Sequence, residues 1–228
     1  RKDRDADDAT MSDITSSENE GYAFAMAGEA LALGAFAAIW IVLVAATGWT
    51  AIIHTSIPVT LQALMLAGAT AFLMLTFRDM SGGHLNPVMT LATGLAGRQH
   101  WRASVGYSIA HIAGALGGIA IGYAFATAQP IFPLTEARVI AEFLGAAVVI
   151  NAVVALRNEA PVDAALGTGA AVALVYWISG GETLANPALT LAQGLFGLGI
   201  DTIQAGPIVA AQLLGGFTGY YVARLLWP

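Results

Sequence analysis

Long apolar runs alternate with short polar segments along most of the chain. We place six such runs at 22–47, 57–77, 103–128, 137–156, 163–180 and 203–226. A bilayer core of about 30 Å requires about 20 helical residues, and each run comes near or exceeds that length. Helices on the surface of a soluble protein would carry a charged stripe at helical spacing, which these runs lack. The pattern therefore predicts six transmembrane helices.

Composition and charge separate a polar tail from an apolar domain. The chain is 57% hydrophobic and 11% charged, with a mean hydropathy of +0.70, whereas soluble domains carry about 25% charged residues. Residues 1–21 hold three basic and seven acidic residues. We expect this segment to be a polar, disordered tail and residues 22–228 to form a single membrane domain.

The same composition excludes several classes of function. A net charge of −6 disfavours nucleic-acid binding, which needs a basic face. The absence of cysteine rules out disulfides and cysteine-ligated metals. We expect neither a metal nor a cofactor.

The loops predict the orientation of the chain. With both termini in the cytoplasm, five arginines lie on the cytoplasmic side and only Arg138 lies outside. The five are Arg78, Arg98, Arg102, Arg157 and Arg224. Because basic residues gather in cytoplasmic loops, this orientation in the cell (inner) membrane is favoured.

Two apolar segments too short to span a bilayer match one another. Residues 86–97 read NPVMTLATGLAG and residues 186–197 read NPALTLAQGLFG, with eight of twelve positions identical. Ser-Gly-Gly precedes each copy, although the second copy has two extra residues before its Asn-Pro. The chain thus divides into halves at about 22–128 and 137–228, each with three spans. An odd number of spans predicts an inverted repeat, whose short matching segments indicate the solute pathway.

Each Asn-Pro pair predicts the start of a half-helix. Asparagine is a favoured N-cap, and proline suits the following position because its missing N–H group is not needed there. About ten residues then rise about 15 Å, which is half of the hydrocarbon core. We expect the two half-helices to enter from opposite faces and to meet at their N-termini.

This arrangement predicts a path for neutral, hydroxylated solutes. Each N-terminus carries about half a positive charge, which repels cations. The capping oxygens of Asn86 and Asn186 are occupied, so we expect their amide groups to be free to donate to a solute. Stretches 82–85 and 182–185 should expose carbonyls as acceptors. The predicted pore carbonyls belong to Gly82, Gly83, His84, Glu182 and Leu184.

These motifs resemble those of the aquaporin and glycerol-facilitator (major intrinsic protein) family. The resemblance rests on Asn86-Pro87-Val88, on Asn186-Pro187-Ala188 and on Ser-Gly-Gly-His-Leu-Asn-Pro at 81–87, and covers about 22–228. It implies six transmembrane helices with two re-entrant half-helices, and a homotetramer with one pore in each subunit.

The resemblance also implies a selectivity filter. Counting back from the motifs places it at Leu66, Leu174, Thr183 and Leu189. The family usually has arginine at the position of Leu189, and its water-specific members have histidine near Leu174 and an aromatic residue near Leu66. Val88 also replaces the usual alanine. We expect an apolar, wider constriction that passes glycerol-like polyols and water. Neutral arsenite is a further expectation, because some bacterial members with an aliphatic residue in place of this arginine resemble arsenical-resistance channels. A water-selective channel or a gate that closes by dewetting remains the alternative.

Buried carboxylates occupy matched positions in the two halves. Glu29 lies in the first span and Glu142 in the fourth. Charged side chains within a membrane are usually functional, and we expect these two to accept N–H groups of the re-entrant loops. His111 and Gln212, also matched, are expected to form hydrogen bonds between helices.

Two other classes of function fit the sequence less well. An intramembrane hydrolase would need a serine and a base within hydrogen-bond reach, and Ser108 with His111 is the available pair. A coupled transporter would need a carboxylate exposed to the pore, for which Glu29 and Glu142 are the candidates. Neither class explains the twin Asn-Pro motifs, so we expect a passive channel that is not an enzyme.

Overall fold

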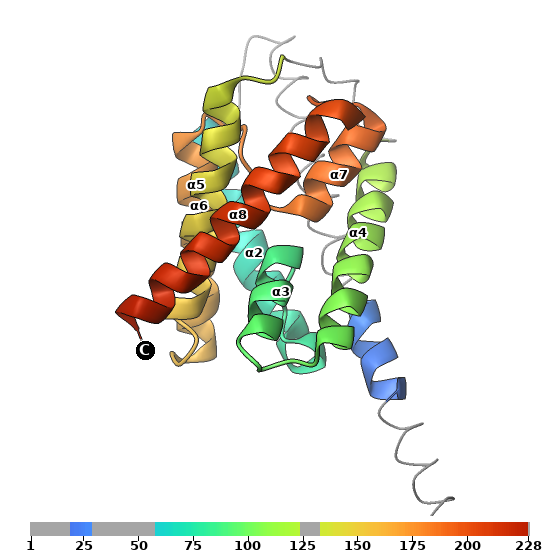
Figure 1. Cartoon of the computed structure of the whole chain (residues 1–228), viewed down its shortest axis with the longest axis vertical. Coiled ribbons are helices and arrows are strands. Elements are labelled where there is room, and N and C mark those ends of the chain that lie inside the picture. The colour runs from blue at the N-terminus through green and yellow to red at the C-terminus, as the bar shows by residue number, and fades with distance from the viewer. Residues whose placement is uncertain (1–18, 29–57, 124–132, 228) are drawn as a thin grey trace, which may run out of the picture.

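The structure is a computed structural model of the chain, and it describes residues 19–28, 58–123 and 133–227. All regular secondary structure in these ranges is helical (Figure 1). Residues 19–28 are helical, but the rest of the predicted first span, including Glu29, lies outside the described residues. Most of the predicted tail lies outside them too.

Five long helices follow the predicted apolar runs. They are α2 (Val59–Ser81), α4 (Trp101–Tyr123), α5 (Glu136–Ala155), α6 (Pro161–Ile178) and α8 (Thr202–Leu226). Four of them, α2, α4, α5 and α6, are long and apolar enough to cross a membrane. An all-helical membrane protein is therefore confirmed, whereas the arrangement of six spans stays a prediction.

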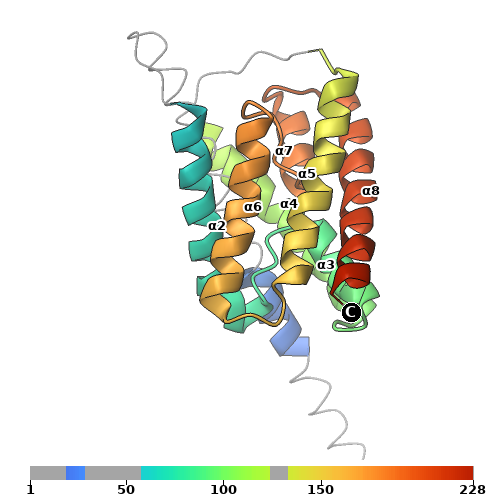
Figure 2. The ribbon, with the colours of Figure 1, turned by 90° about the vertical axis from the view of Figure 1, so that its left-hand side faces the viewer.

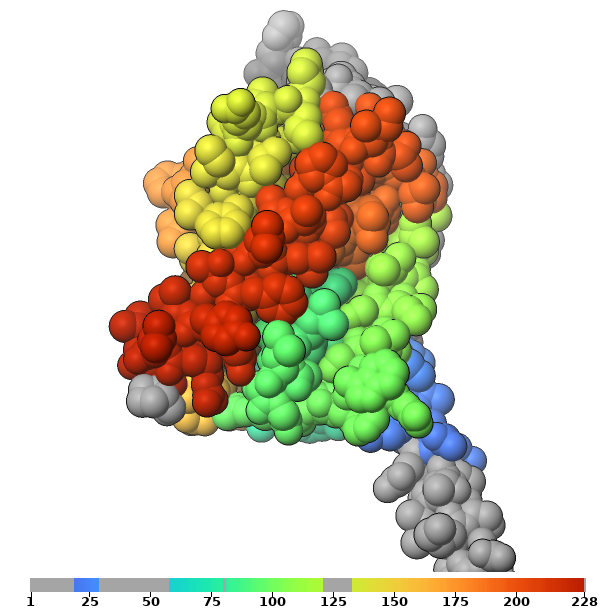
Figure 3. Space-filling model, in the orientation of Figure 1, coloured from blue at the N-terminus to red at the C-terminus, as the bar shows by residue number. Residues whose placement is uncertain are grey.

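Four of the long helices stand in one row. Viewed from the side, α2, α6, α5 and α8 follow one another, with α3, α4 and α7 behind them (Figure 2). In the orientation of Figure 1, α8 crosses the front of the molecule obliquely between α5 and α3 (Figure 3). Within this row, α5 packs closely against α8 and α2 packs closely against α6.

Glycines permit this close packing. A Cβ atom added to Gly215 would lie 2.0 Å from the carbonyl oxygen of Phe143, and one on Gly219 would lie 2.1 Å from that of Ala147. Between α6 and α2, a Cβ atom on Gly169 would lie 2.5 Å from the carbonyl oxygen of Ala67. Small residues at such positions let membrane helices approach closely.

Two short helices lie between the long ones. Helix α3 comprises Pro87–Leu95 and α7 comprises Pro187–Phe196. In Figure 1, α3 lies toward the end of the bundle that holds the C-terminus, and α7 toward the other end. Their starts meet in the interior, where they form the candidate site.

Candidate functional site

Both short helices begin at a capped asparagine, as their sequence predicts. Asn86 has extended backbone (φ −153°, ψ 125°), and its Oδ1 accepts a hydrogen bond from the Val88 N–H at 2.9 Å. Asn186 repeats this geometry, with Oδ1 accepting from the Ala188 N–H at 3.1 Å. Proline occupies the first helical position in both copies. Both helix starts are therefore set by local residues. The asparagine accepts a hydrogen bond from a free N–H group of the helix terminus, and the proline has no N–H group that needs a partner.

The two asparagines also bind each other's loops. Asn86 Nδ2 donates to the carbonyl oxygen of Ala185 at 2.8 Å, and Asn186 Nδ2 donates to that of Leu85, also at 2.8 Å. These reciprocal bonds hold the N-termini of α3 and α7 against each other, with the symmetry that an inverted repeat would give. The expectation that both amide groups are free is therefore wrong in part, because one hydrogen of each is committed to the other loop. The second hydrogen of each remains available.

The residue before each asparagine adopts an unusual backbone conformation. Leu85 has φ 55° and Ala185 has φ 51°, and this left-handed region disfavours residues with a Cβ atom by about 1–2 kcal/mol. The conformation turns each carbonyl toward the opposite asparagine, so the hydrogen bonds across the junction offset the strain. Nothing in the side chains of leucine or alanine predicts this role.

Glu142 connects three elements around the second loop. Its Oε2 accepts from the Ala185 N–H at 3.2 Å and from Gln212 Nε2 at 2.8 Å. Gln212 Nε2 also donates to Thr190 Oγ1 at 2.8 Å, which ties α8 to α7. Glu142 is 2% exposed and Gln212 is fully buried. Gln212 thus makes the predicted bond between helices, and Glu142 contacts the loop it was expected to support.

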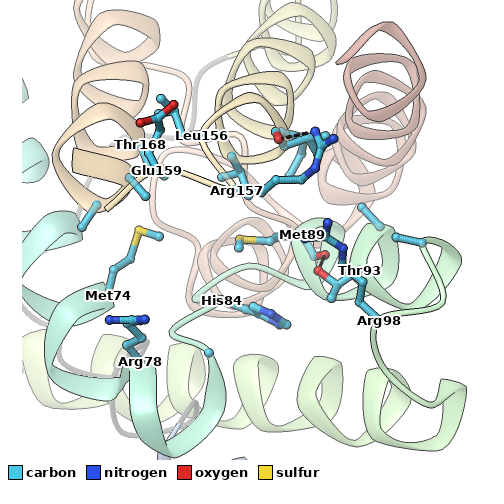
Figure 4. Close-up of a pocket in the computed structure, with 18 of the residues that line it drawn as sticks. Met74, Arg78, His84, Met89, Thr93, Arg98, Leu156, Arg157, Glu159 and Thr168 are labelled. Atoms are coloured by element: carbon cyan, nitrogen blue, oxygen red, sulfur yellow. Dashed lines mark hydrogen bonds between the residues drawn. The ribbon is translucent and has the colours of Figure 1, made fainter. Parts of the chain in front are cut away.

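Two cavities that share lining residues lie between the end of the bundle that holds the C-terminus and the junction. The outer part has a volume of about 270 Å³, and the inner part, of about 40 Å³, is lined by Asn86 and Asn186. Met74, His84 and Met89 line both parts, and Figure 4 shows them around the passage. The His84 ring is held by Thr90, with 3.0 Å between Nδ1 and Oγ1.

The predicted carbonyl residues are distributed unevenly around this cavity. Gly82 and His84 line the outer part, and His84 and Leu184 line the inner part. Gly83 is buried against the backbone of Met74, where a Cβ atom would lie 2.6 Å from the carbonyl oxygen. Glu182 is exposed and lines neither part. The structure thus brings Gly82, His84 and Leu184 to the lining of the cavity, and Glu182 is not among its lining residues.

Beyond the junction, apolar side chains pack closely. Leu66 and Leu189 are 0% and 1% exposed and belong to one buried cluster, which also contains Leu184 and Tyr176. Thr183 is buried nearby, its methyl group facing Gly145. Three of the four residues expected in the filter therefore lie inside the protein next to the junction.

Leu174 differs from the other three expected filter residues in its exposure. It is 49% exposed, whereas Tyr176, two residues later on α6, is 3% exposed and donates its hydroxyl to Gln62 Oε1 of α2 at 2.8 Å. Two residues turn a helix by about 200°, so an offset of two moves a side chain to the opposite face. Leu174 at the filter therefore stays a prediction, and Tyr176 is the residue of α6 that packs in the buried cluster.

Ser108 is not arranged as a nucleophile. Its hydroxyl donates to the carbonyl oxygen of Ser104 on the same helix at 2.8 Å. Among the residues that the structure describes, no group of three or more histidine, aspartate or glutamate side chains could hold a metal ion.

The fold, the twin motifs and the passage agree with what sequence comparison shows. Residues 19–137 match the sequence model of the family described as major intrinsic protein, and the chain belongs to that family. Members of this family are membrane channels rather than enzymes, and the described apolar helices agree with a multi-pass membrane protein.

A curated relative is the aquaglyceroporin AqpS of Rhizobium meliloti (strain 1021). It is 28% identical to the chain over 159 residues, which cover 64% of the chain. The alignment spans 66% of that relative, slightly less than two thirds of its length.

Proposed function

We propose that the protein is a passive channel for small uncharged solutes. Glycerol-like polyols and water are the principal solutes, and neutral trivalent arsenite has a comparable arrangement of hydroxyl groups. The observation that carries this proposal is the reciprocal pairing of Asn86 with Ala185 and of Asn186 with Leu85 at the inner end of an open cavity. The name of the relative, an aquaglyceroporin, supports the polyol class.

The junction supplies both selectivity against ions and contacts for solutes. Two helix N-termini face one point, and their partial positive charges disfavour cations there. The second amide hydrogen of each asparagine can donate to a hydroxyl group in passing. In this proposal α3 and α7 are re-entrant half-helices that meet in mid-membrane, with six spans around them. Non-helical backbone at that depth is tolerated where it lines a wet cavity.

We further propose that Leu66, Leu189 and Tyr176 form the constriction, with Thr183 beside them. Leucine stands at position 189 in place of the usual arginine, so this constriction has no fixed positive charge there. A solute that carries apolar carbon therefore meets an apolar wall with few polar contacts. Glu142 supports the loop before α7, and we assign the same role to Glu29 in the other half. The assembly is a homotetramer in the cell membrane with both termini in the cytoplasm.

A channel gated by dewetting is the second candidate. The close burial of Leu66 and Leu189 and the hydrogen bond from Tyr176 to Gln62 favour it, because a hydrophobic constriction can expel water and close. In that case flux depends on the separation of α2 from α6. Both candidates place solute selection at the same apolar cluster.

Replacing Leu189 with arginine tests the proposed constriction. Arginine is longer and brings a fixed charge, so glycerol flux into proteoliposomes is expected to fall by about tenfold, an effect of about 1.4 kcal/mol on the barrier. Water flux, measured by stopped-flow light scattering on the same vesicles, should fall less, because water is smaller. Leu195→Arg is the matched control, since Leu195 is on the same helix and is 63% exposed. Equal losses of both fluxes would contradict selection by size at this position.

A further inference from the structure

Four arginines line the outer part of the cavity, and each comes from a different element. Arg78 is in the last turn of α2 and Arg98 follows α3, while Arg157 follows α5 and Arg224 is in the last turn of α8. Figure 4 shows Arg78, Arg98 and Arg157 on different sides of the opening. Elements that are far apart in sequence thus bring the same type of side chain to one mouth.

The mouth concentrates most of the basic charge of the membrane domain. Residues 22–228 contain six basic residues, all arginine, and four of them line this cavity. The acidic residue that shares the lining is Glu159, so the described wall has a formal excess of three positive charges. Positive charges that converge on one cavity repel one another, and a bound anion offsets this repulsion.

The neighbouring contacts leave this charge available to a ligand. Arg157 donates from Nη1 to the Val154 carbonyl and from Nη2 to the Trp227 carbonyl, both at 2.8 Å, which fixes its guanidinium at the wall. Arg78, Arg98 and Arg224 are exposed, and in the described ranges none of the three forms an ion pair with a carboxylate. Arg157 is thus held in place by hydrogen bonds, whereas Arg78, Arg98 and Arg224 are exposed around the opening.

Membrane orientation explains which side these arginines occupy, but not why they converge. Basic residues gather on the cytoplasmic side of membrane proteins without any need to surround a pore. Arg102, near the same end, shows that simpler behaviour: its guanidinium carbon lies 5.8 Å from the centre of the exposed Trp101 ring, and it does not line the cavity. Arg102 is therefore a natural control for the other arginines.

We propose that this arginine-lined mouth binds a phosphate group, either free or as part of a small phosphoester. The guanidinium group presents paired N–H donors that match two oxygens of a phosphate, and a multivalent anion balances the excess charge. A volume of about 270 Å³ accommodates a phosphate together with several waters, each of which occupies about 30 Å³. A bound phosphate stands between the outside and Met74, His84 and Met89, so it obstructs the passage from this end. The obstruction rests on the proposed function, whereas the binding does not.

The binding is tested on the purified full chain in a neutral detergent. Inorganic phosphate is titrated calorimetrically into the wild type, into Arg78→Gln/Arg98→Gln and into Arg102→Gln. Loss of the charge-assisted bonds of two arginines is expected to weaken binding by about tenfold or more, and Arg102→Gln should bind like the wild type. Added salt should weaken the wild-type affinity, because it screens exposed charges. Equal affinity in all three proteins, or no binding by the wild type in detergent or in bilayers, would overturn the proposal.

The source of the phosphate is separated by lipid composition. The same titration is repeated in vesicles of phosphatidylcholine alone and in vesicles that also contain phosphatidic acid. Unchanged binding in both assigns the site to a soluble phosphate, and loss in the second shows that a lipid headgroup competes for it. A separate flux assay with phosphate on one side of the vesicle tests obstruction: slower glycerol entry in the wild type but not in Arg78→Gln/Arg98→Gln is the expected result. Binding without any glycerol flux would contradict the proposed function and leave the phosphate site supported, whereas flux without binding would do the reverse.

Discussion

Replacing Glu142 with alanine is expected to lower the free energy of unfolding of the protein by about 3 kcal/mol or more. The carboxylate accepts hydrogen bonds from the Ala185 N–H and from Gln212 Nε2 in a fully buried setting. Alanine leaves the Ala185 N–H without its acceptor and removes the link from α5 to α8. For a protein of this length the loss corresponds to about 10 °C in Tm, measured by thermal unfolding in detergent.

Glu136→Ala is the matched control for this experiment. Glu136 lies in the first turn of the same helix and is exposed, so its contribution is limited to a favourable interaction with the helix dipole of about 0.3–1 kcal/mol. Glycerol flux should fall with Glu142→Ala, because the Ala185 carbonyl that receives Asn86 loses its support, and should persist with Glu136→Ala. Equal stability of the two variants would show that Glu142 does not hold the loop.

Gly215→Ala is expected to be the other strongly destabilising change. A Cβ atom at this position would lie 2.0 Å from the Phe143 carbonyl oxygen, so α8 must move away from α5 along the interface. Forcing extra atoms into a packed interior costs about 1–3 kcal/mol and occasionally more. Because Gln212 is one turn away on the same helix, the shift also weakens its bond to Glu142. Size-exclusion chromatography and thermal unfolding measure the loss.

Gly206→Ala is the matched control on the same helix. A Cβ atom at Gly206 would meet no atom within 4 Å outside its chain neighbours. Alanine in a helix interior is favoured over glycine by about 0.5–1 kcal/mol, whereas the following Pro207 disfavours a residue with a Cβ atom in helical conformation. Because these two effects oppose each other, the variant should be close to the wild type in stability. Destabilisation of both variants by a similar amount would place the effect in helix α8 itself and not in its contact with α5.

The helices and their starts can be predicted from the sequence because both depend on residues that are close together in the chain. The apolar runs match the long helices within a few residues where the structure describes them. Asn86-Pro87 and Asn186-Pro187 begin α3 and α7 because capping depends on neighbours in sequence. Gly215 and Gly219 bring α8 close to α5, as small residues four apart indicate.

The contacts across the junction could not be predicted from sequence. The bonds from Asn86 to Ala185 and from Asn186 to Leu85 need the positive φ angles of Leu85 and Ala185. Side chains of leucine and alanine carry no signal for that conformation. The repeat nevertheless contained a clue, since the matched offset of 100 residues implies that any contact made by one motif has a counterpart in the other.

Counting along the chain predicts a position but not the burial of a side chain. Leu66 is counted back from Asn86 through the loop 82–85, whereas Leu189 directly follows Asn186-Pro187-Ala188, and both lie in the buried cluster. Leu174 is counted back from Asn186 and is half-exposed, and Tyr176 is the residue of α6 that lies in that cluster. Similarly, the distribution of charge predicts the side on which Arg78, Arg98, Arg157 and Arg224 gather, but only the packed fold shows that they surround one cavity.

Cysteine substitution tests most directly whether solutes pass through the cavity and the asparagine junction. The chain contains no cysteine, so a single introduced thiol can be modified by a methanethiosulfonate reagent without background. Met89 lines both parts of the cavity, whereas Leu174 is half-exposed on α6. We predict that the reagent stops glycerol flux through Met89→Cys and leaves flux through Leu174→Cys unchanged, with mass spectrometry confirming that both thiols are labelled. Unchanged flux through labelled Met89→Cys, or a block confined to Leu174→Cys, would contradict the pathway proposed for this protein.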